Sequence, residues 1–104
     1  MKPVQAKEEV MSCLRAHKDV IRHFGVKRLG LFGSFVRNAQ NEQSDVDLLV
    51  EFLPGKKTFR NFIGLAFFLE DLLQRKVELV TAESLSPYLK SSILNEVESV
   101  ETAP

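Results

Sequence analysis

Two short stretches decide the fold of this chain: Gly33-Ser34-Phe35-Val36-Arg37 and Ser44-Asp45-Val46-Asp47-Leu48-Leu49-Val50. Residues 26–32, before the first stretch, are largely apolar and contain a glycine, which predicts a buried strand that ends at Gly33-Ser34. Residues 45–52 predict a second strand whose side chains alternate between two faces. One face would hold Val46, Leu48, Val50 and Phe52, and the other Asp45, Asp47, Leu49 and Glu51.

The segments next to these strands predict turns and a long helix. Ser34 is a favoured N-cap, so residues 34–37 are expected to form the first turn of a short helix. Residues 38–44 are polar and predict a loop. After the second strand, Pro54-Gly55 is a turn signal, and Thr58 can cap a helix that runs to about Gln74.

The two ends of the chain predict further elements. Apolar residues at helical spacing predict one amphipathic helix from about Val4 to Phe24, and Gly25 would end it. Residues 76–80 predict a third strand. Ser86-Pro87 is a cap followed by a first-turn proline, and it predicts a last helix to about Val97. Its apolar side would hold Leu89, Ile93, Leu94 and Val97, and residues 100–104 are expected to fray.

Strands interleaved with helices predict one α+β domain over residues 1–104, with helices packed on a small mixed sheet. The length suits a single domain, and 44% hydrophobic residues argue against disorder. Lys plus Arg and Asp plus Glu number 14 each, so no broad basic face for stable nucleic-acid binding is expected. One cysteine, Cys13, and no signal-peptide core predict a cytoplasmic protein, and residues 62–69 are too short an apolar run to span a membrane.

Asp45 and Asp47 are the first residues expected to carry chemistry. They lie two apart on a predicted strand, so both carboxylates project from one face. Close carboxylates repel each other unless a positive charge lies between them. Mg²⁺ suits that role, because it takes a few carboxylates and completes its shell with water and substrate phosphates. A solvated pair of acidic side chains is the alternative interpretation.

The Gly33-Ser34 turn is a candidate phosphate cradle. Glycine lets the backbone approach a phosphate closely, and a helix that starts there offers free N–H groups. Arg37 lies one helical turn later, and its planar guanidinium matches phosphate geometry. An ordinary turn and a surface ion pair are the alternatives, but the combination with the two aspartates favours a nucleotide site.

The two stretches together resemble the signature of the minimal nucleotidyltransferases, a family of the DNA polymerase beta-like superfamily. The pattern is Gly-Ser, ten residues, then Asp-x-Asp, here from Gly33 to Asp47. The resemblance covers nearly the whole chain, with residues 76–81 similar to the third strand of the family and residues 87–97 to its closing helix. It implies a polymerase beta-like nucleotidyltransferase fold.

The resemblance also implies roles for single residues. Gly33 and Ser34 would hold the triphosphate, and Arg37 and Ser44 complete the expected nucleotide-binding set. The catalytic and metal-binding residues would be Asp45, Asp47 and Glu78, with two Mg²⁺ ions likewise implied. The reaction would be attack of a hydroxyl on the α-phosphate of ATP, with pyrophosphate leaving.

Two positions depart from the pattern of the family. Its third carboxylate is usually Asp, whereas this chain has Glu78, whose longer side chain shifts the oxygens by more than about 1 Å and could slow turnover. Glu78 could also be a plain surface residue. The residue after the motif arginine is commonly Gly, and Asn38 stands there, which also tolerates a left-handed backbone.

The resemblance finally implies a partner. Such proteins are often paired with small all-helical HEPN-type proteins in toxin–antitoxin systems, and there the transferase is the antitoxin and a tyrosine of the partner is the acceptor of AMP. The alternative is a binding module with a weak site that neutralises its partner by contact. A transferase acting on a small molecule fits less well, because the chain has no room for an acceptor domain.

The helix predicted from residue 58 onward is apolar on more than one side. Its core stripe would be Phe62, Leu65, Ala66, Leu69 and Leu73. Phe59, Ile63 and Phe67 lie on the flank of that stripe, and a helix that is apolar nearly all round needs more than one covering surface. We expect either a homodimer or partner contact through these three residues, or a thick core beneath the sheet.

Overall fold

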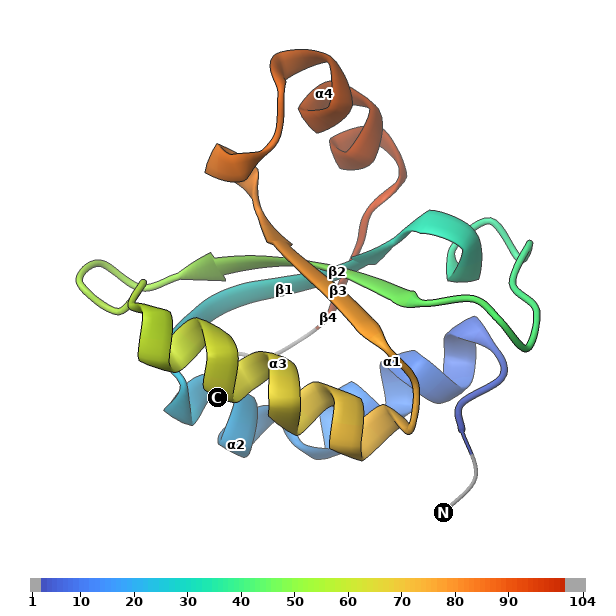
Figure 1. Cartoon of the computed structure of the whole chain (residues 1–104), viewed down its shortest axis with the longest axis horizontal. Helices are drawn as coiled ribbons and strands as arrows, with labels where there is room; N and C mark the ends of the chain where they lie inside the picture. Colours follow the sequence, from blue (N-terminus) through green and yellow to red (C-terminus); the bar gives the residue numbers. More distant parts are fainter. Residues whose placement is uncertain (1–2, 101–104) are drawn as a thin grey trace.

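The computed structural model describes residues 3–100, and a four-stranded mixed sheet forms its centre (Figure 1). The strands β1 (Val26–Phe32), β2 (Val46–Phe52), β3 (Val77–Thr81) and β4 (Glu98–Val100) lie in the order β3-β2-β1-β4. β1 is antiparallel to β2 and to β4, whereas β2 and β3 are parallel. The prediction of a small mixed sheet with helices is confirmed.

Three helices cover one face of this sheet: α1 (Lys7–Ala16), α2 (Lys18–His23) and α3 (Phe59–Leu73) (Figure 1). Thr58 caps α3 by accepting a hydrogen bond from the Asn61 N–H, as its sequence predicts. The predicted alternation of β2 is also confirmed, because Val46, Leu48 and Val50 are buried against the helices and the intervening residues are not. Asp47 therefore lies on the face of the sheet opposite to α3.

The helix α4 (Pro87–Glu96) lies on that other face, apart from the rest (Figure 1). Ser86 caps it and Pro87 occupies its first turn, as predicted. Its expected apolar side does not pack into the core, because Leu89 and Leu94 remain 51% and 49% exposed. Every residue of α4 is at least partly exposed, so this helix is held mainly by its two ends.

The single helix predicted for residues 4–24 is wrong, because the chain forms two helices that break at His17. The His17 ring Nδ1 lies 3.0 Å from the Cys13 carbonyl oxygen, which a continuous helix would offer to the His17 N–H. That N–H donates to Leu14 O instead, in a tighter turn. Val4 lies outside the helix in extended backbone, and its N–H donates to Leu73 O at 3.1 Å.

Two further expectations need correction. Gly33–Phe35 form a single 3₁₀ turn, η1, without a side-chain cap from Ser34, because the turn begins at Gly33 in the left-handed region (φ +80°). Val100 does not fray: it is buried in β4 and pairs with Leu29 of β1. Residues 101–104 lie outside the described residues. Within residues 3–100, all helices are too short or too polar to cross a membrane.

Candidate active site

Asp47 occupies the centre of the candidate site, because its strand is flanked by the other two signature segments. β2 pairs Asp47 with Phe32, the last residue of β1, on one side. It pairs Asp47 with Glu78 of β3 on the other side. Asp45 precedes the first residue of β2. The sheet thus places Gly33, Asp45, Asp47 and Glu78 at neighbouring positions.

Gly33 and Asp47 are in direct steric contact. A Cβ placed on Gly33 would overlap Oδ2 of Asp47 and lie only 2.9 Å from its Cγ. Real Cβ atoms are not found so close to another heavy atom, so the Asp47 carboxylate occupies the space that a side chain at position 33 would take. The left-handed backbone of Gly33 adds a second reason for glycine.

The electrostatics of the site centre on the same carboxylate. The pKa of Asp47 is raised from 3.8 to about 6, chiefly by burial and also by the nearby negative charges of Glu78 and Asp45. Arg37 lowers this pKa and Glu96 raises it. The site therefore carries more negative charge than it can compensate from its own side chains, which is the condition in which a carboxylate cluster gains by binding a cation.

The donor chemistry of this cluster fits Mg²⁺, which prefers carboxylate oxygens. Asp45, Asp47 and Glu78 are the residues that would hold it. Among residues 3–100, no three acidic, histidine or cysteine side chains already stand close enough together to hold a metal ion. Binding would therefore require the carboxylates to close around the ion.

The structure brings two parts of the predicted phosphate cradle, Gly33 and Arg37, to the same side chain. The Gly33 N–H and the Arg37 guanidinium point to one place, and both donate to the carboxylate of Glu96. Sequence reasoning missed Glu96, because it follows Gly33 by 63 residues and no local pattern links the end of α4 to the glycine turn. Ser34 lies in the turn beside Gly33 and is partly buried, and its carbonyl oxygen accepts from the Ala39 N–H at 2.8 Å.

The structure places Ser44, one of the predicted nucleotide-binding residues, in the loop that leads to Asp45. Its hydroxyl accepts from the Asn41 N–H at 2.9 Å and so closes the loop that leads to Asp45. Arg75, which sequence reasoning did not assign to the site, supports the same loop by donating to Ser44 O at 2.9 Å and to Asn41 O at 3.0 Å. Its guanidinium also lies over the Phe35 ring, 5.1 Å from the centroid.

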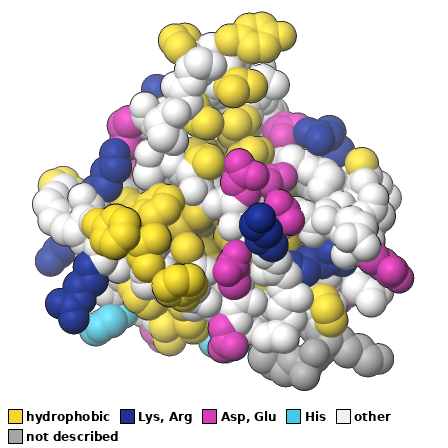
Figure 2. Space-filling view, in the orientation of Figure 1, with side chains coloured by type: hydrophobic (Ala, Val, Ile, Leu, Met, Phe, Trp, Pro, Cys, Tyr) yellow, Lys and Arg dark blue, Asp and Glu magenta, His cyan; other side chains and the backbone are white. Residues whose placement is uncertain are grey.

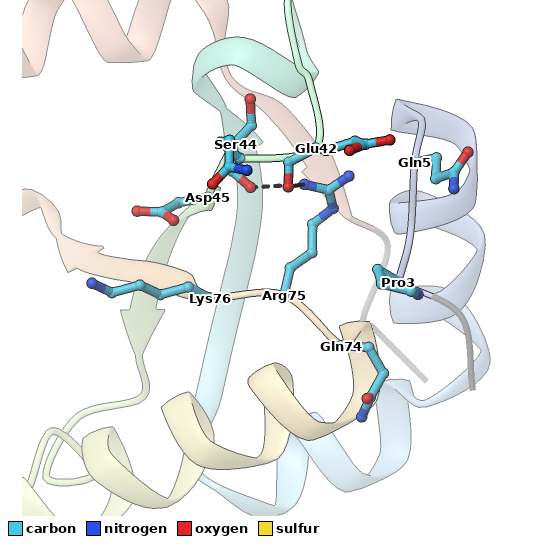
Figure 3. A pocket seen from close by; sticks show the side chains of 9 residues that line it. Pro3, Gln5, Glu42, Ser44, Asp45, Gln74, Arg75 and Lys76 are labelled. Carbon is cyan, nitrogen blue, oxygen red and sulfur yellow. Dashed lines mark hydrogen bonds between the residues drawn. The ribbon is translucent and has the colours of Figure 1, made fainter.

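Arg75 and Asp45 both line a cavity of about 470 Å³ at the edge of the site (Figure 3). Figure 3 shows the Arg75 side chain pointing from the end of α3 toward the loop before β2. The figure also shows Asp45 and Lys76 on the neighbouring side of this cavity. The full lining comprises Pro3, Gln5, Glu42, Gln43, Ser44, Asp45, Gln74, Arg75 and Lys76.

The outer side of α3 presents a separate apolar surface. Phe59 is 81% exposed and Phe67 is 67% exposed, whereas Ile63 is partly buried. Figure 2 shows hydrophobic side chains gathered over this helix and acidic side chains grouped around a basic one nearer the middle of the same face. The expected core stripe of α3 is confirmed, but a thick core that would cover Phe59 and Phe67 is not present in the described residues.

Comparison with known proteins gives consistent matches. The model of the nucleotidyltransferase domain family matches residues 14–100. The protein adenylyltransferase MntA of Thermococcus cleftensis is 44% identical over 91 residues, which cover 86% of this chain and 91% of that protein. A solved structure of a candidate minimal nucleotidyltransferase is 34% identical, with a TM-score of 0.71 over 85% of this chain and 93% of the other.

A more distant structural match shares the fold. It is the complex of a tri-AMPylated Shewanella oneidensis HEPN toxin with an MNT antitoxin, with 19% identity and a TM-score of 0.63. The match covers 89% of this chain and 73% of the other. At this level of identity the likeness concerns the backbone arrangement alone.

Proposed function

We propose a function from one premise: this chain belongs to the nucleotidyltransferase domain family and is a nucleotidyltransferase. The reaction that we propose is Mg²⁺-dependent transfer of AMP from ATP to a hydroxyl group of a protein. The proposal rests on the position of Asp47. This residue lies between Gly33, which is too close to it to carry a side chain, and Glu78, its neighbour on β3. The name protein adenylyltransferase of the Thermococcus relative supports AMP as the transferred group.

In this proposal the residues of the chain have separate tasks. Asp45, Asp47 and Glu78 would hold two Mg²⁺ ions, which would supply positive charge to stabilise the negative charge that develops during transfer. The Gly33 N–H, Ser34, Arg37 and Ser44 orient the triphosphate. Glu78, the most exposed of the three carboxylates, also accepts the proton of the attacking hydroxyl.

The bond changes follow from this arrangement. The acceptor oxygen forms a bond to the α-phosphorus while the bond between the α-phosphorus and its bridging oxygen breaks, and pyrophosphate leaves. The hydroxyl proton passes to a carboxylate of the site. Arg37, as an exposed guanidinium beside the cradle, suits the charge on the departing pyrophosphate.

The acceptor that we propose is a tyrosine of an all-helical HEPN-type partner in the cytoplasm, with this chain as the antitoxin. The support is the structural match that contains an AMPylated HEPN toxin with its MNT antitoxin, together with the named activity of the Thermococcus relative. The exposed apolar surface of Phe59, Ile63 and Phe67 would serve either this partner or a second copy of the chain.

The second candidate function is a binding module that neutralises its partner by contact alone. Two observations favour it: the carboxylates are not gathered around a metal position in residues 3–100, and α3 presents large exposed aromatic side chains. The two functions differ in what an Asp47→Asn variant would do. It would abolish neutralisation but spare partner binding for an enzyme, and it would change neither for a binding module.

Label transfer tests the proposal directly. The purified protein is incubated with Mg²⁺, ATP labelled at the α-phosphate and a lysate of its host that lacks this protein. We expect label on one small protein, its absence with the Asp45→Asn, Asp47→Asn variant, and full labelling with Asp71→Asn, an exposed aspartate on α3. Absence of label, together with no rise in melting temperature on adding ATP and Mg²⁺, would favour the binding module.

A further inference from the structure

The carboxylate of Glu96 fills the position where the candidate phosphate cradle directs its donors. Its Oε2 accepts from the Gly33 N–H at 2.7 Å. The Arg37 Nη1 donates to Oε1 at 2.9 Å and to Oε2 at 3.1 Å. A backbone N–H and a guanidinium that converge on two oxygens form the contact set that a phosphate group would also use.

We propose that Glu96 is an intramolecular substitute for a nucleotide phosphate, so that the free protein keeps its own triphosphate site closed until nucleotide displaces this side chain. The inference rests on the proposed function, because it assigns a mode of regulation to the same site. It goes beyond that function in naming a residue of α4 as a competitor of the substrate.

The contact is built into the fold and does not depend on a freely moving side chain. Val97, the next residue, packs over Gly30 of β1 so closely that a Cβ on Gly30 would lie 2.5 Å from the Val97 Cγ2. β4 then pairs with β1, and Glu98 forms an ion pair with Lys7 at 2.9 Å. These contacts fix the chain just after Glu96 and direct its side chain toward Gly33.

The same structure lets Glu96 leave at low cost. α4 has no side chain in the core, so a small displacement of its last turn would disturb little packing. The side chain of Arg37 is 57% exposed, and that of Glu96 is 25% exposed. An ion pair open to water is weak, and a multiply charged phosphate can replace it.

The charges of the closed site favour this exchange. Glu96 brings another negative charge toward Asp47, which Asp45 and Glu78 already face. Triphosphate is also anionic, but it arrives together with divalent cations, whereas within residues 3–100 Glu96 forms its ion pair with Arg37 alone. Exchange of Glu96 for Mg²⁺-bound triphosphate therefore relieves a repulsion that the free protein retains.

Affinity measurements on the full-length chain test the proposal. Calorimetry with a non-hydrolysable ATP analogue and Mg²⁺ compares wild type with Glu96→Gln, which keeps the shape of the side chain and removes its charge. Loss of the competing contact should tighten nucleotide binding by several-fold, up to about tenfold for one charge-assisted contact. Glu8→Gln, which changes an exposed glutamate of α1, is the matched control, and its affinity should equal that of wild type.

The outcomes distinguish the role of Glu96 from the proposed function. Tighter binding by Glu96→Gln supports the inference. Equal or weaker binding by this variant, with wild type binding normally, would overturn the inference and leave the proposed function standing. Failure of wild type, Glu96→Gln and Glu8→Gln alike to bind the analogue would overturn both.

A second measurement observes the contact itself and also reports folding. Labelling with ¹⁵N-glycine gives five amide signals, because the chain has 5 glycines. The Gly33 signal should shift in Glu96→Gln while the signals of Gly25, Gly55 and Gly64 stay in place. In wild type, inorganic tripolyphosphate with Mg²⁺ should also move the Gly33 signal, since it replaces the carboxylate. A Gly33 signal unchanged by the substitution would refute the contact in solution.

Discussion

Gly33 begins the turn η1 and Asp47 lies on β2, yet the carboxylate of Asp47 occupies the volume that a side chain on Gly33 would need. This relationship explains why the glycine turn and the second aspartate belong to one structural unit. Any larger residue at position 33 would displace the Asp47 carboxylate from its present position and would also strain a backbone with φ of +80°.

We therefore expect Gly33→Ala to destabilise the fold and to abolish transfer of AMP. Gly55→Ala is the matched control, because Gly55 has nearly the same φ of +79° and no neighbouring atom within 4 Å of an added Cβ. The control should lose about 1 kcal/mol of unfolding free energy from the backbone alone, and Gly33→Ala roughly 1–3 kcal/mol more from the overlap. Urea unfolding measures both, and equal losses would show that the contact is unimportant.

The raised pKa of Asp47 predicts how stability depends on pH. Its pKa of about 6 in the folded state lies above the ordinary 3.8, so folding favours the protonated form. The contribution to stability is thus fully present below about pH 4 and is lost as pH rises through about 6. Without metal, Asp47→Asn should be more stable than wild type at about pH 8 and equal to it at about pH 4.

Thermal unfolding in a chelating buffer checks this expectation, with Asp71→Asn as the control on an exposed surface. Mg²⁺ should then raise the melting temperature of wild type above pH 6 and leave Asp47→Asn unchanged. If stability depended on pH in the same way for wild type and Asp47→Asn, folding would not raise the pKa of Asp47.

Glu78 can be tested against its alternative interpretation as a surface residue. It is exposed and pairs in register with Asp47, so its carboxylate faces the site without supporting the core. We expect Glu78→Gln to lower the transfer rate on the order of a hundredfold, since removal of a catalytic proton acceptor typically costs that much. Its stability should match wild type, and Glu78→Asp should retain activity. A fully active Glu78→Gln would remove Glu78 from the mechanism.

The exposed aromatic residues of α3 predict a surface for association. Phe59 and Phe67 are 81% and 67% exposed, so Phe59→Ser and Phe67→Ser should leave the unfolding free energy within about 0.5 kcal/mol of wild type. Their effect should appear in light scattering as a loss of self-association or in pull-down as a loss of the partner. Phe62→Ser, which replaces a side chain packed against the core, is the contrasting variant and should unfold the protein more easily.

Local signals in the sequence were sufficient for the strands and for most of the site. The boundaries of β1, the Thr58 and Ser86 caps and the alternation of β2 all depend on neighbouring residues, and each was predicted. The break at His17 was not predictable, because the apolar period of Leu14 and Ile21 continues through it and both residues are buried. β4 was missed because three residues are too few to show a period.

The part of the site that could not be predicted depends on contacts between distant segments. Glu96 reaches Gly33 across 63 residues, and no spacing in the sequence indicates that approach. The role of Arg75 was also not predictable from the sequence. A basic residue just after a helix is favoured by the helix dipole and so does not by itself indicate a contact with a distant loop. In the structure its guanidinium instead joins the loop before Asp45 to the N-terminal segment.

Arg75 is accordingly expected to position Asp45. Its guanidinium donates to the Val4 carbonyl oxygen through Nε and to those of Asn41 and Ser44 through Nη1, and lysine lacks this fork of separate nitrogens. Arg75→Lys should cost about 1–3 kcal/mol of unfolding free energy and raise the Mg²⁺ concentration needed for half-maximal transfer. Lys76→Ala, at the neighbouring exposed position, is the control for charge and should not affect stability. If Arg75→Lys loses stability but keeps the same Mg²⁺ requirement, Arg75 supports the fold without orienting Asp45.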